Sequence, residues 1–327
     1  MKALVFGSGP MNSKIVKRHL KVRKGGLSTL FLTSLPIMKN LKNMIILSSV
    51  IFLIIGLAAN VLAKGTRMDT TTVDVWPEGK MPGRAATEPE QDNPANNVHR
   101  ITNVSHPTLS LFPAPKKGAP APAMIVCPGG GYSYVSFDKE GTEIAAWLNA
   151  NGFTALVLKY RVPDNREGAL QDLQRALSLA RAHAAEWNID RKRLGVIGFS
   201  AGGNLGAKAS TLFAARAYPD VDGVDRQSCR PDFVVLVYPA YLDKDGQVAP
   251  DLNLKAKIPP TLIISTEDDK NYVAGCKLYH AALDAAKVPN EFLLYANGGH
   301  GYGLRSDKEV HVWPQAALAW LHKVGVK

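Results

Sequence analysis

The sequence has few cysteines and no internal repeats. Its 327 residues include only three cysteines, without a Cys-x-x-Cys pair or a His/Cys cluster. A structural zinc site is therefore not expected, and we predict no metal. An odd count would still allow one bridge in an exported protein, with Cys229 and Cys276 as the candidate pair. Cys127 ends an apolar run, so we expect it to be buried. No repeat of about 20 to 50 residues is visible, which excludes a solenoid or propeller.

Acidic residues are absent from the first 63 positions, which hold nine lysines and arginines. The whole chain carries a net charge of +11, a value that would ordinarily suggest a nucleic-acid or anionic-membrane partner. The remaining chain, however, has 30 basic and 28 acidic residues, a net charge of only +2. We therefore expect no nucleic-acid partner, and the basic N-terminal segment needs its own explanation.

Residues 43–63 form an uncharged, mostly apolar run behind a short basic lead. Together with Val61-Leu-Ala63 at its end, this pattern is typical of a secretory signal peptide cleaved after Ala63, and Met38 would make a conventional start for it. The run also reaches membrane-spanning length, so an uncleaved anchor is the alternative. We therefore expect an exported protein, secreted or periplasmic, with membrane contact only if 43–63 is retained.

The sequence divides into an N-terminal extension with the signal peptide or anchor (1–63), an extended lead rich in Pro, Gly, Thr and acid (64–100), and a main domain (101–327). In the main domain, apolar runs alternate with helical patterns. Strands are predicted at 123–127, 153–160, 194–199, 233–238, 261–265 and 291–295, and helices at 143–151, 170–187, 201–215, 273–287 and 313–324. Continuous Val/Ile/Leu runs are typical of strands buried on both faces. The pattern predicts an α/β fold with a doubly wound, mostly parallel sheet and helices on both faces.

In such sheets functional groups lie just after the strands, at their carboxyl ends. The strand at 194–199 is followed by Gly198-Phe-Ser200-Ala-Gly-Gly203, a G-x-S-x-G sequence between a strand and a helix. A sharp turn there needs small residues around the serine, because backbone segments come close together. The pattern identifies Ser200 as a candidate nucleophile. No G-x-G-x-x-G stands here, so a dinucleotide site is not indicated and we expect no cofactor.

Three glycines follow the strand at 123–127, in Pro128-Gly-Gly-Gly-Tyr132. Such a loop leaves the backbone free to direct N–H groups at a developing oxyanion. The expected donors are the N–H groups of Gly130, Gly131 and Ala201, the last being the residue after the nucleophile.

An acid and a histidine follow two later strands. Asp268 and Asp269 stand after 261–265, and either could orient a histidine; we favour Asp269. Four histidines follow Ser200, at positions 280, 300, 311 and 322, and only His300 lies in a Gly-rich loop after a strand. His300 is therefore the candidate general base. The resulting chain order is Ser, Asp, His.

Seven motifs occur in order along the chain: VWPEGKMPG (75–83), VCPGGGY (126–132), LKYRVP (158–163), GFSAGGNL (198–205), SCRPDFVVLVYPAY (228–241), TEDD (266–269) and GGHGYGLR (298–305). In these motifs the chain from about residue 73 onward resembles the α/β-hydrolase superfamily, nearest its hormone-sensitive-lipase-like and bacterial acetylxylan-esterase-like branch. The resemblance places the catalytic triad at Ser200, Asp269 and His300. Two positions depart from it. Pro128 stands where lipase-like members usually have His, and the acid motif lacks the usual Val-Pro behind it, which keeps Asp268 open.

The resemblance implies a serine carboxylesterase that acts on short acyl, above all acetyl, esters of polysaccharides. We expect Tyr132, Tyr134 and Tyr302 to line the substrate pocket, with Tyr241 and Trp313 as further candidates. The alternatives are a general esterase or lipase, a serine peptidase of the same fold, or a non-catalytic binding domain. Some relatives are called xylanases, but glycosidic cleavage needs two carboxylates around one bond, and this architecture commits its acid to the histidine.

Overall fold

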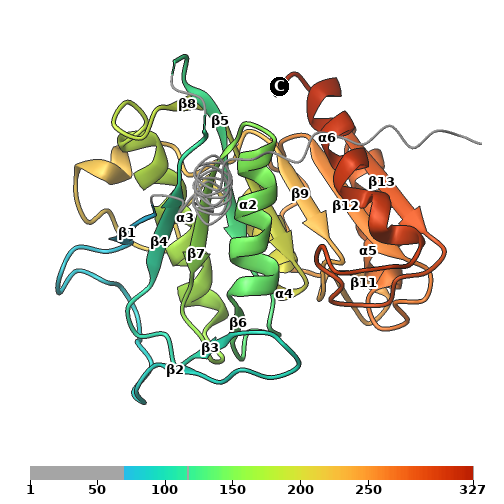
Figure 1. Cartoon of the computed structure of the whole chain (residues 1–327), viewed down its shortest axis with the longest axis horizontal. Coiled ribbons are helices and arrows are strands. Elements are labelled where there is room, and N and C mark those ends of the chain that lie inside the picture. The colour runs from blue at the N-terminus through green and yellow to red at the C-terminus, as the bar shows by residue number, and fades with distance from the viewer. Residues whose placement is uncertain (1–69, 116–117, 327) are drawn as a thin grey trace, which may run out of the picture. The chain divides into compact units, whose positions relative to one another are not determined.

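The protein is described here by a computed structural model that covers residues 70–115 and 118–326 (Figure 1). The described residues all fall within one compact unit, Arg67–Lys327. The apolar segment 43–63 lies outside the described residues, so its assignment as signal peptide or anchor stays a prediction. Within the described ranges, no helix has the length and apolar character needed to cross a membrane.

An eight-stranded sheet forms the centre of the larger unit, and it is mostly parallel as predicted. Its strands, in spatial order, are β1 (Thr71–Asp74), β4 (Thr108–Phe112), β7 (Thr154–Lys159), β5 (Ala121–Cys127), β8 (Ile189–Phe199), β9 (Val234–Val237), β12 (Thr261–Thr266) and β13 (Asn290–Tyr295). The six strands from β7 to β13 are parallel to one another. Only β4 runs against its neighbours β1 and β7.

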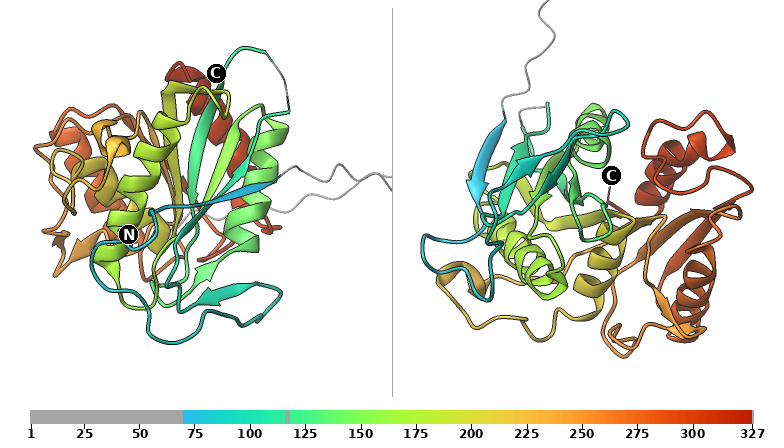
Figure 2. Two further views of the ribbon diagram at one scale, coloured as in Figure 1. Left: turned by 90° about the vertical axis from the view of Figure 1, so that its left-hand side faces the viewer. Right: turned by 90° about the horizontal axis from the view of Figure 1, so that it is seen from below.

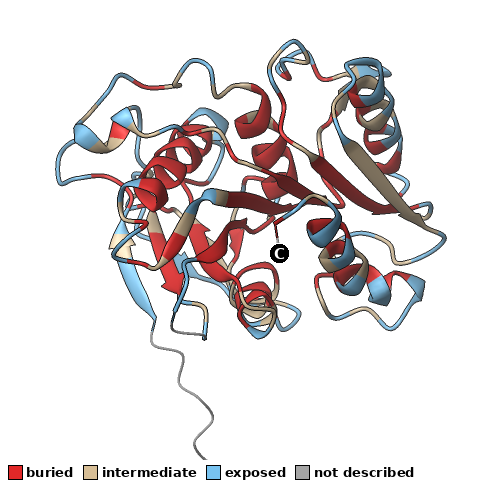
Figure 3. Cartoon of the chain, turned by 90° about the horizontal axis from the view of Figure 1, so that it is seen from above, coloured by how far each residue is buried: buried red, intermediate tan, exposed pale blue. Residues whose placement is uncertain are grey.

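Helices cover both faces of this sheet, as the lower-side view in Figure 2 shows. They are α2 (Glu143–Ala150), α3 (Arg166–Ala182), α4 (Ala201–Thr211), α5 (Val273–Ala285) and α6 (Trp313–Lys323). Alternate residues of β5 face opposite layers. Ile125 packs in the cluster that contains α3 and α4 residues, and Met124 packs in the cluster that contains α2 and α6 residues. Because helices cover the strand on both faces, all its side chains are buried and apolar. This explains the unbroken apolar run in the sequence and the red central strands of Figure 3.

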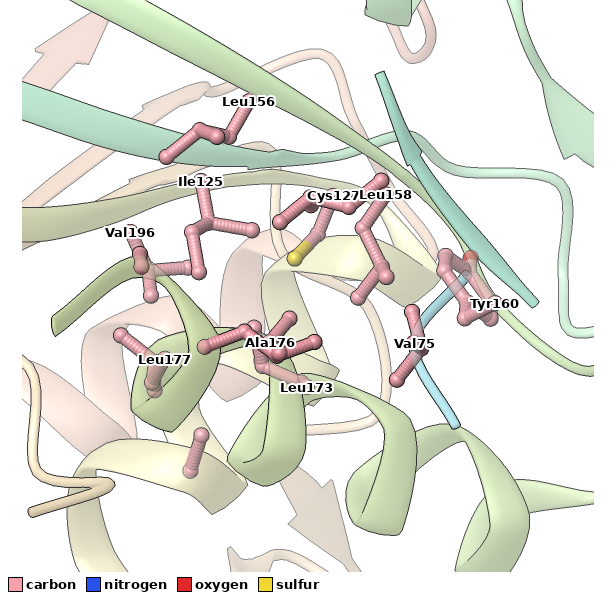
Figure 4. Close-up of a cluster of buried hydrophobic side chains, with 14 of the residues drawn as sticks. Val75, Ile125, Cys127, Leu156, Leu158, Tyr160, Leu173, Ala176, Leu177 and Val196 are labelled. Atoms are coloured by element: carbon pink, nitrogen blue, oxygen red, sulfur yellow. The ribbon is translucent and has the colours of Figure 1, made fainter. Parts of the chain in front are cut away.

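Cysteines take part in this core as small apolar side chains. Cys127 is fully buried against α3, in the cluster drawn in Figure 4, which confirms the expected burial. The predicted pair Cys229–Cys276 is wrong, because all three thiols are free. Cys229 packs in the α3 cluster, whereas Cys276 packs in a separate cluster around α5. Each of the two thiols instead lies within hydrogen-bond distance of a nearby carbonyl.

The lead 64–100 contributes more structure than an extended lead would. Strand β1 joins the edge of the main sheet. Strand β2 (Gln91–Asp92) pairs with β3 (Arg100–Thr102), and β3 pairs with β6 (Val135–Ser136), in a separate three-stranded sheet that lies below the main sheet in Figure 1. This small sheet comes close to the loop after β5, because β6 follows that loop directly.

The connections after β5 and β8 run in opposite directions along the sheet. From β5 the chain passes through α2 to β7 on one side, and from β8 it passes through α4 to β9 on the other. The carboxyl ends of β5 and β8 therefore form a topological switch point, where open α/β sheets bind their ligands. Both the glycine loop and Ser200 lie at this point.

Candidate active site

Ser200 lies at the turn from β8 into α4 in a strained backbone conformation, with φ of 51° and ψ of −116°. The turn is tight enough that a Cβ on Gly198 would lie 2.1 Å from the carbonyl oxygen of Gly202. The Ser200 N–H donates to the carbonyl of Val237 on the neighbouring strand β9. Strain held by surrounding hydrogen bonds keeps the serine hydroxyl raised above the strand ends.

His300 reaches this hydroxyl from the loop after β13. Its Nε2 lies 2.7 Å from Ser200 Oγ, although the two residues are 100 positions apart. The rings of Tyr238 and Tyr272 pack against the imidazole at centroid distances of 5.1 and 4.7 Å. These rings fix the orientation of the imidazole while about 30% of its side chain stays exposed.

Asp269, and not Asp268, is the acid that contacts the histidine. Asp269 Oδ2 lies 2.7 Å from His300 Nδ1, and its side chain is almost fully buried. Asp268 accepts hydrogen bonds from the backbone N–H groups of Gly298 and Gly299 instead. These bonds, the Gly299 bond above all, lower the Asp268 pKa from 3.8 to about 2. The two neighbouring acids thus have different roles. Asp269 orients His300, and Asp268 binds the backbone of the loop that contains His300.

Two carbonyls of the glycine loop are bound by backbone N–H groups of the residues that follow it. The Gly129 carbonyl accepts from Ser136 N–H, and the Gly130 carbonyl accepts from the N–H groups of Ser133 and Tyr134. Because N–H and C=O point oppositely across a trans peptide, the N–H groups of Gly130 and Gly131 point to the other side of the loop. Only glycine fits at Gly130, where φ is 131° and a Cβ would lie 2.1 Å from the Tyr134 carbonyl. Ala201 begins α4, so its N–H has no partner within the helix.

Glu140 connects this loop to the histidine loop, a role that the sequence did not suggest. Its Oε2 accepts from Gly129 N–H at 2.7 Å, and its Oε1 accepts from the Tyr238 hydroxyl at 2.8 Å. The same hydroxyl accepts from Gly303 N–H at 3.0 Å. Burial raises the pKa of Glu140, while these two donors act in the opposite direction.

A cavity of about 360 Å³ opens beside Ser200 and His300. Two of the candidate pocket residues, Tyr134 and Tyr241, line it, and so do Gly130 and Gly131, the expected oxyanion donors. The other lining residues are Asn96, Val98, Arg100, Ser136, Lys139, Glu140, Tyr272 and Gly301, none of which the sequence had singled out. Across the described ranges, no three His, Cys, Asp or Glu side chains are grouped to hold a metal ion.

Two of the predicted pocket tyrosines lie in the core instead. Tyr132 is 1% exposed, and its hydroxyl donates to Asn204 Oδ1 at 2.8 Å. Tyr302 is 6% exposed and packs edge-on against Tyr238 at 4.3 Å. Trp313 is likewise buried, with its indole N–H bound to the Gly303 carbonyl. None of these three rings is among the residues that line the cavity.

Comparison with known proteins gives matches to one group of hydrolases. The family model BD-FAE matches residues 109–231. Over 208 residues the chain is 30% identical to an acetylxylan esterase of Xylanibacter ruminicola, which covers 55% of this chain and 41% of that protein. Over 222 residues it is 29% identical to an endo-1,4-beta-xylanase B of Butyrivibrio fibrisolvens, which covers 58% of this chain and 34% of that protein. The chain thus spans less than half the length of these curated relatives.

The solved structures match over nearly their whole length. The chain is 31% identical to an acetyl ester-xyloside bifunctional hydrolase from Caldicellulosiruptor lactoaceticus, with a TM-score of 0.64 over 78% of this chain and 97% of that one. It is 30% identical to MGS-M1, an alpha/beta hydrolase enzyme from a Medee basin deep-sea metagenome library, with a TM-score of 0.55 over 70% and 97% of the two chains.

Proposed function

Because the chain belongs to the α/β-hydrolase superfamily, in its acetylxylan-esterase-like branch, we propose that it is a serine carboxylesterase acting on short acyl esters of polysaccharides. The observation that carries this proposal is the hydrogen-bonded series Ser200, His300, Asp269 at the edge of the cavity. A nucleophile, a base and an acid that orients the base are the parts needed for acyl transfer. They stand at the point of the sheet where this chemistry is usually found.

In the proposed reaction, Ser200 Oγ attacks the ester carbonyl while its proton passes to His300 Nε2. Asp269 stabilises the imidazolium through Nδ1. When the tetrahedral intermediate collapses, the C–O bond to the sugar breaks and His300 returns the proton to the departing alcohol. Water, deprotonated by His300, then attacks the acyl-enzyme, which releases the carboxylic acid and restores the Ser200 hydroxyl.

The negative charge that develops on the ester carbonyl oxygen must be stabilised by hydrogen-bond donors placed close to that oxygen. We assign this role to the N–H groups of Gly130, Gly131 and Ala201. The loop geometry supports the assignment, since the Gly129 and Gly130 carbonyls are bound on the opposite side. The start of α4 adds the positive end of a helix dipole beside Ser200.

Acetyl esters of xylan or a related polysaccharide are the proposed substrates. Support comes from the named activities of two relatives, the acetylxylan esterase and the acetyl ester-xyloside hydrolase. Tyr134, Tyr241 and Tyr272 line the cavity and offer flat faces to a sugar ring. Cleavage of glycosidic bonds is not part of the proposal. Glu140 is the one acidic side chain among the described residues that line the cavity, and two hydrogen bonds engage it.

Export is proposed as well, on the pattern of 43–63 alone. N-terminal sequencing of the mature protein from its native host would reveal cleavage after Ala63 for a signal peptide. An uncleaved N-terminus in the membrane fraction would identify an anchor.

The test of activity uses 4-nitrophenyl esters of increasing acyl length together with acetylated xylan. We expect the highest kcat/KM for acetate and release of acetate from xylan, without new reducing ends. A preference for long acyl chains would favour a general esterase or lipase. The absence of any ester hydrolysis above the Ser200→Ala background would refute the proposal and favour the peptidase or binding-domain alternatives.

A further inference from the structure

Positive side chains outnumber negative ones on the cavity wall beside Ser200. Arg100 and Lys139 line this wall. The acid among the lining residues, Glu140, is 5% exposed and accepts hydrogen bonds from Gly129 and Tyr238. The neighbouring acid Asp138 is bound by Arg305. The wall therefore carries more positive than negative side chains, with Glu140 as its one acid among the described lining residues.

Arg100 differs from the other arginines that reach the interior. Arg161, Arg175 and Arg181 each form an ion pair with an aspartate. Within residues 70–115 and 118–326, by contrast, no ion pair to Arg100 is found, and its buried Nε has no hydrogen-bond partner. A buried donor without an acceptor is unfavourable unless something else supplies the acceptor. Arg100 lines the cavity, so a ligand bound there would meet a guanidinium whose charge is not paired within the described residues.

The Arg100 side chain is held in place rather than free to turn into solvent. Its guanidinium lies over the Tyr134 ring at 5.0 Å, and its backbone pairs with Ser136 on β6. Tyr134 is tied in turn to the glycine loop by its N–H bond to the Gly130 carbonyl. The guanidinium is therefore preorganised beside the loop to which the oxyanion is assigned. A planar guanidinium in a fixed position suits a carboxylate better than any neutral acceptor.

We propose that Arg100 is a specificity residue that binds a carboxylate of the substrate, and that the natural substrates are therefore acidic esters. Lys139, which follows β6 and lines the same cavity, adds to the positive potential. This inference rests on the proposed esterase function and narrows its substrate class. The carboxylate can belong to the alcohol part, as a uronic acid near the acetylated sugar, or to the acyl part, as the free end of a dicarboxylic acid monoester.

The test compares kcat/KM of the full chain for matched acidic and neutral esters. The first pair is an acetylated xylooligosaccharide with and without a glucuronic acid branch, assayed by acetate release. The second pair is the 4-nitrophenyl monoester of adipic acid and 4-nitrophenyl hexanoate. The variants are Arg100→Gln and Arg100→Lys. Arg230→Gln is the matched control, because Arg230 also lies over an aromatic ring, that of Phe213, but away from the cavity.

We expect the wild type to prefer the acidic member of one pair, and Arg100→Gln to lower that preference about tenfold, the size of one charge-assisted hydrogen bond. If the preference for the acidic ester is lost in the first pair, the carboxylate belongs to the sugar. If it is lost in the second pair, the carboxylate belongs to the acyl group. Arg100→Lys should keep part of the preference, and Arg230→Gln all of it. The wild-type preference should also fall between about 0.02 and about 0.3 M salt, since exposed charges are screened.

Three results would separate the claims. Equal loss on acidic and neutral esters in Arg100→Gln would overturn the inference, since Arg100 would then bind a neutral acceptor. A wild-type enzyme without any acidic preference would overturn it too, and would leave ester hydrolysis standing. Only a wild type that hydrolyses neither member of either pair would remove the proposed function itself. If Arg100→Gln fails to fold, the inference is tested by three other results. These are the wild-type preference for acidic esters, the salt dependence of that preference, and the preference of Arg100→Lys.

Discussion

The cavity is built from two regions of different construction. The catalytic floor, Ser200, Asp269 and His300, follows β8, β12 and β13, and all of β12 and the last six residues of β8 are buried. The cavity rim, Arg100, Tyr134 and Lys139, comes from or beside β3 and β6, strands of three and two residues. Long buried strands hold the floor in one geometry through the core, whereas the rim depends on a few local contacts. This difference suggests that the floor determines the chemistry and the rim determines which ester is accepted.

The largest effect that would test the floor is loss of the nucleophile. Ser200→Ala should lower kcat by about 10⁴-fold or more, because no other group on the floor can form the acyl-enzyme. Rates on 4-nitrophenyl acetate measure this, and far-UV circular dichroism checks that the fold is kept. Residual activity of a tenth of the wild type, from a preparation free of contaminating esterase, would mean that another residue is the nucleophile.

The two neighbouring acids provide a second, internally controlled test of the floor. Asp269→Asn should lower kcat by about 10³- to 10⁴-fold, because the carboxylate that orients His300 and stabilises its cation is lost. Asp268→Asn should cost less than about tenfold, since Asp268 binds the backbone N–H groups of the histidine loop and the Thr266 side chain rather than His300. The reverse order of the two variants would transfer the catalytic role to Asp268.

Glu140 lies between floor and rim and sharpens the comparison. Glu140→Gln places an amide NH₂ opposite one of two donors, Gly129 N–H or the Tyr238 hydroxyl, and so disturbs the glycine loop. We expect kcat to fall about 10- to 100-fold with a smaller change in KM, because a donor to the oxyanion acts mainly in the transition state. Glu143→Gln is the control, since Glu143 forms an exposed ion pair with Arg305. An equal effect of both variants would speak against a specific role of Glu140.

A change in the rim should act on binding more than on turnover. Tyr134→Ala removes the ring under Arg100 and one aromatic face of the cavity. For acetylated xylooligosaccharides we expect KM to rise about fivefold to tenfold, with a smaller effect on kcat. Tyr134→Phe keeps the ring and should lie close to the wild type. If kcat falls more than KM rises, the rim takes part in the chemistry and the division proposed here is wrong.

The smallest effect concerns the stability of the histidine loop. The Asp268 pKa is lowered from 3.8 to about 2 in the folded protein, so its contribution to stability is present above pH 4. It should disappear as the pH falls from about 4 to about 2. Asp268→Asn should therefore be less stable than the wild type at pH 6, and urea unfolding should show the gap closing in that acidic window. A gap that is constant with pH would assign the loss to packing instead.

The floor was predictable from the sequence because each of its parts has a local signature. Each of these signatures can be recognised in a short stretch of sequence, without knowing which distant residues it will contact. They are a serine between small residues, glycines after a strand, and a histidine in a glycine-rich loop. The choice between Asp268 and Asp269 was less certain, since adjacent carboxylates look alike in the sequence. Only the direction of each side chain separates them, and that direction depends on the turn after β12.

The rim was not predictable, and the errors share a cause. Tyr132 and Tyr302 stand in the same glycine-containing segments as the site residues, and Tyr132 is only two positions from Tyr134, yet both are buried in the core. The strands β1, β2 and β3 are short and partly exposed, so the lead 64–100 shows no clear period. The candidate disulfide between Cys229 and Cys276 rested only on the number of cysteines in the chain. That number does not indicate which core cluster each cysteine joins.

The sequence by itself determined the class of fold, the six parallel strands of the main sheet with the helices between them, and the residues of the nucleophile turn, but not β1 and β4. These features follow from hydrophobic period and from backbone conformations that only small residues permit. The tertiary structure decided which carboxylate meets His300, which tyrosines face the cavity, and that Glu140 joins the two loops. Those contacts join positions up to about 100 residues apart, and such proximity arises only when the sheet brings the strand ends together.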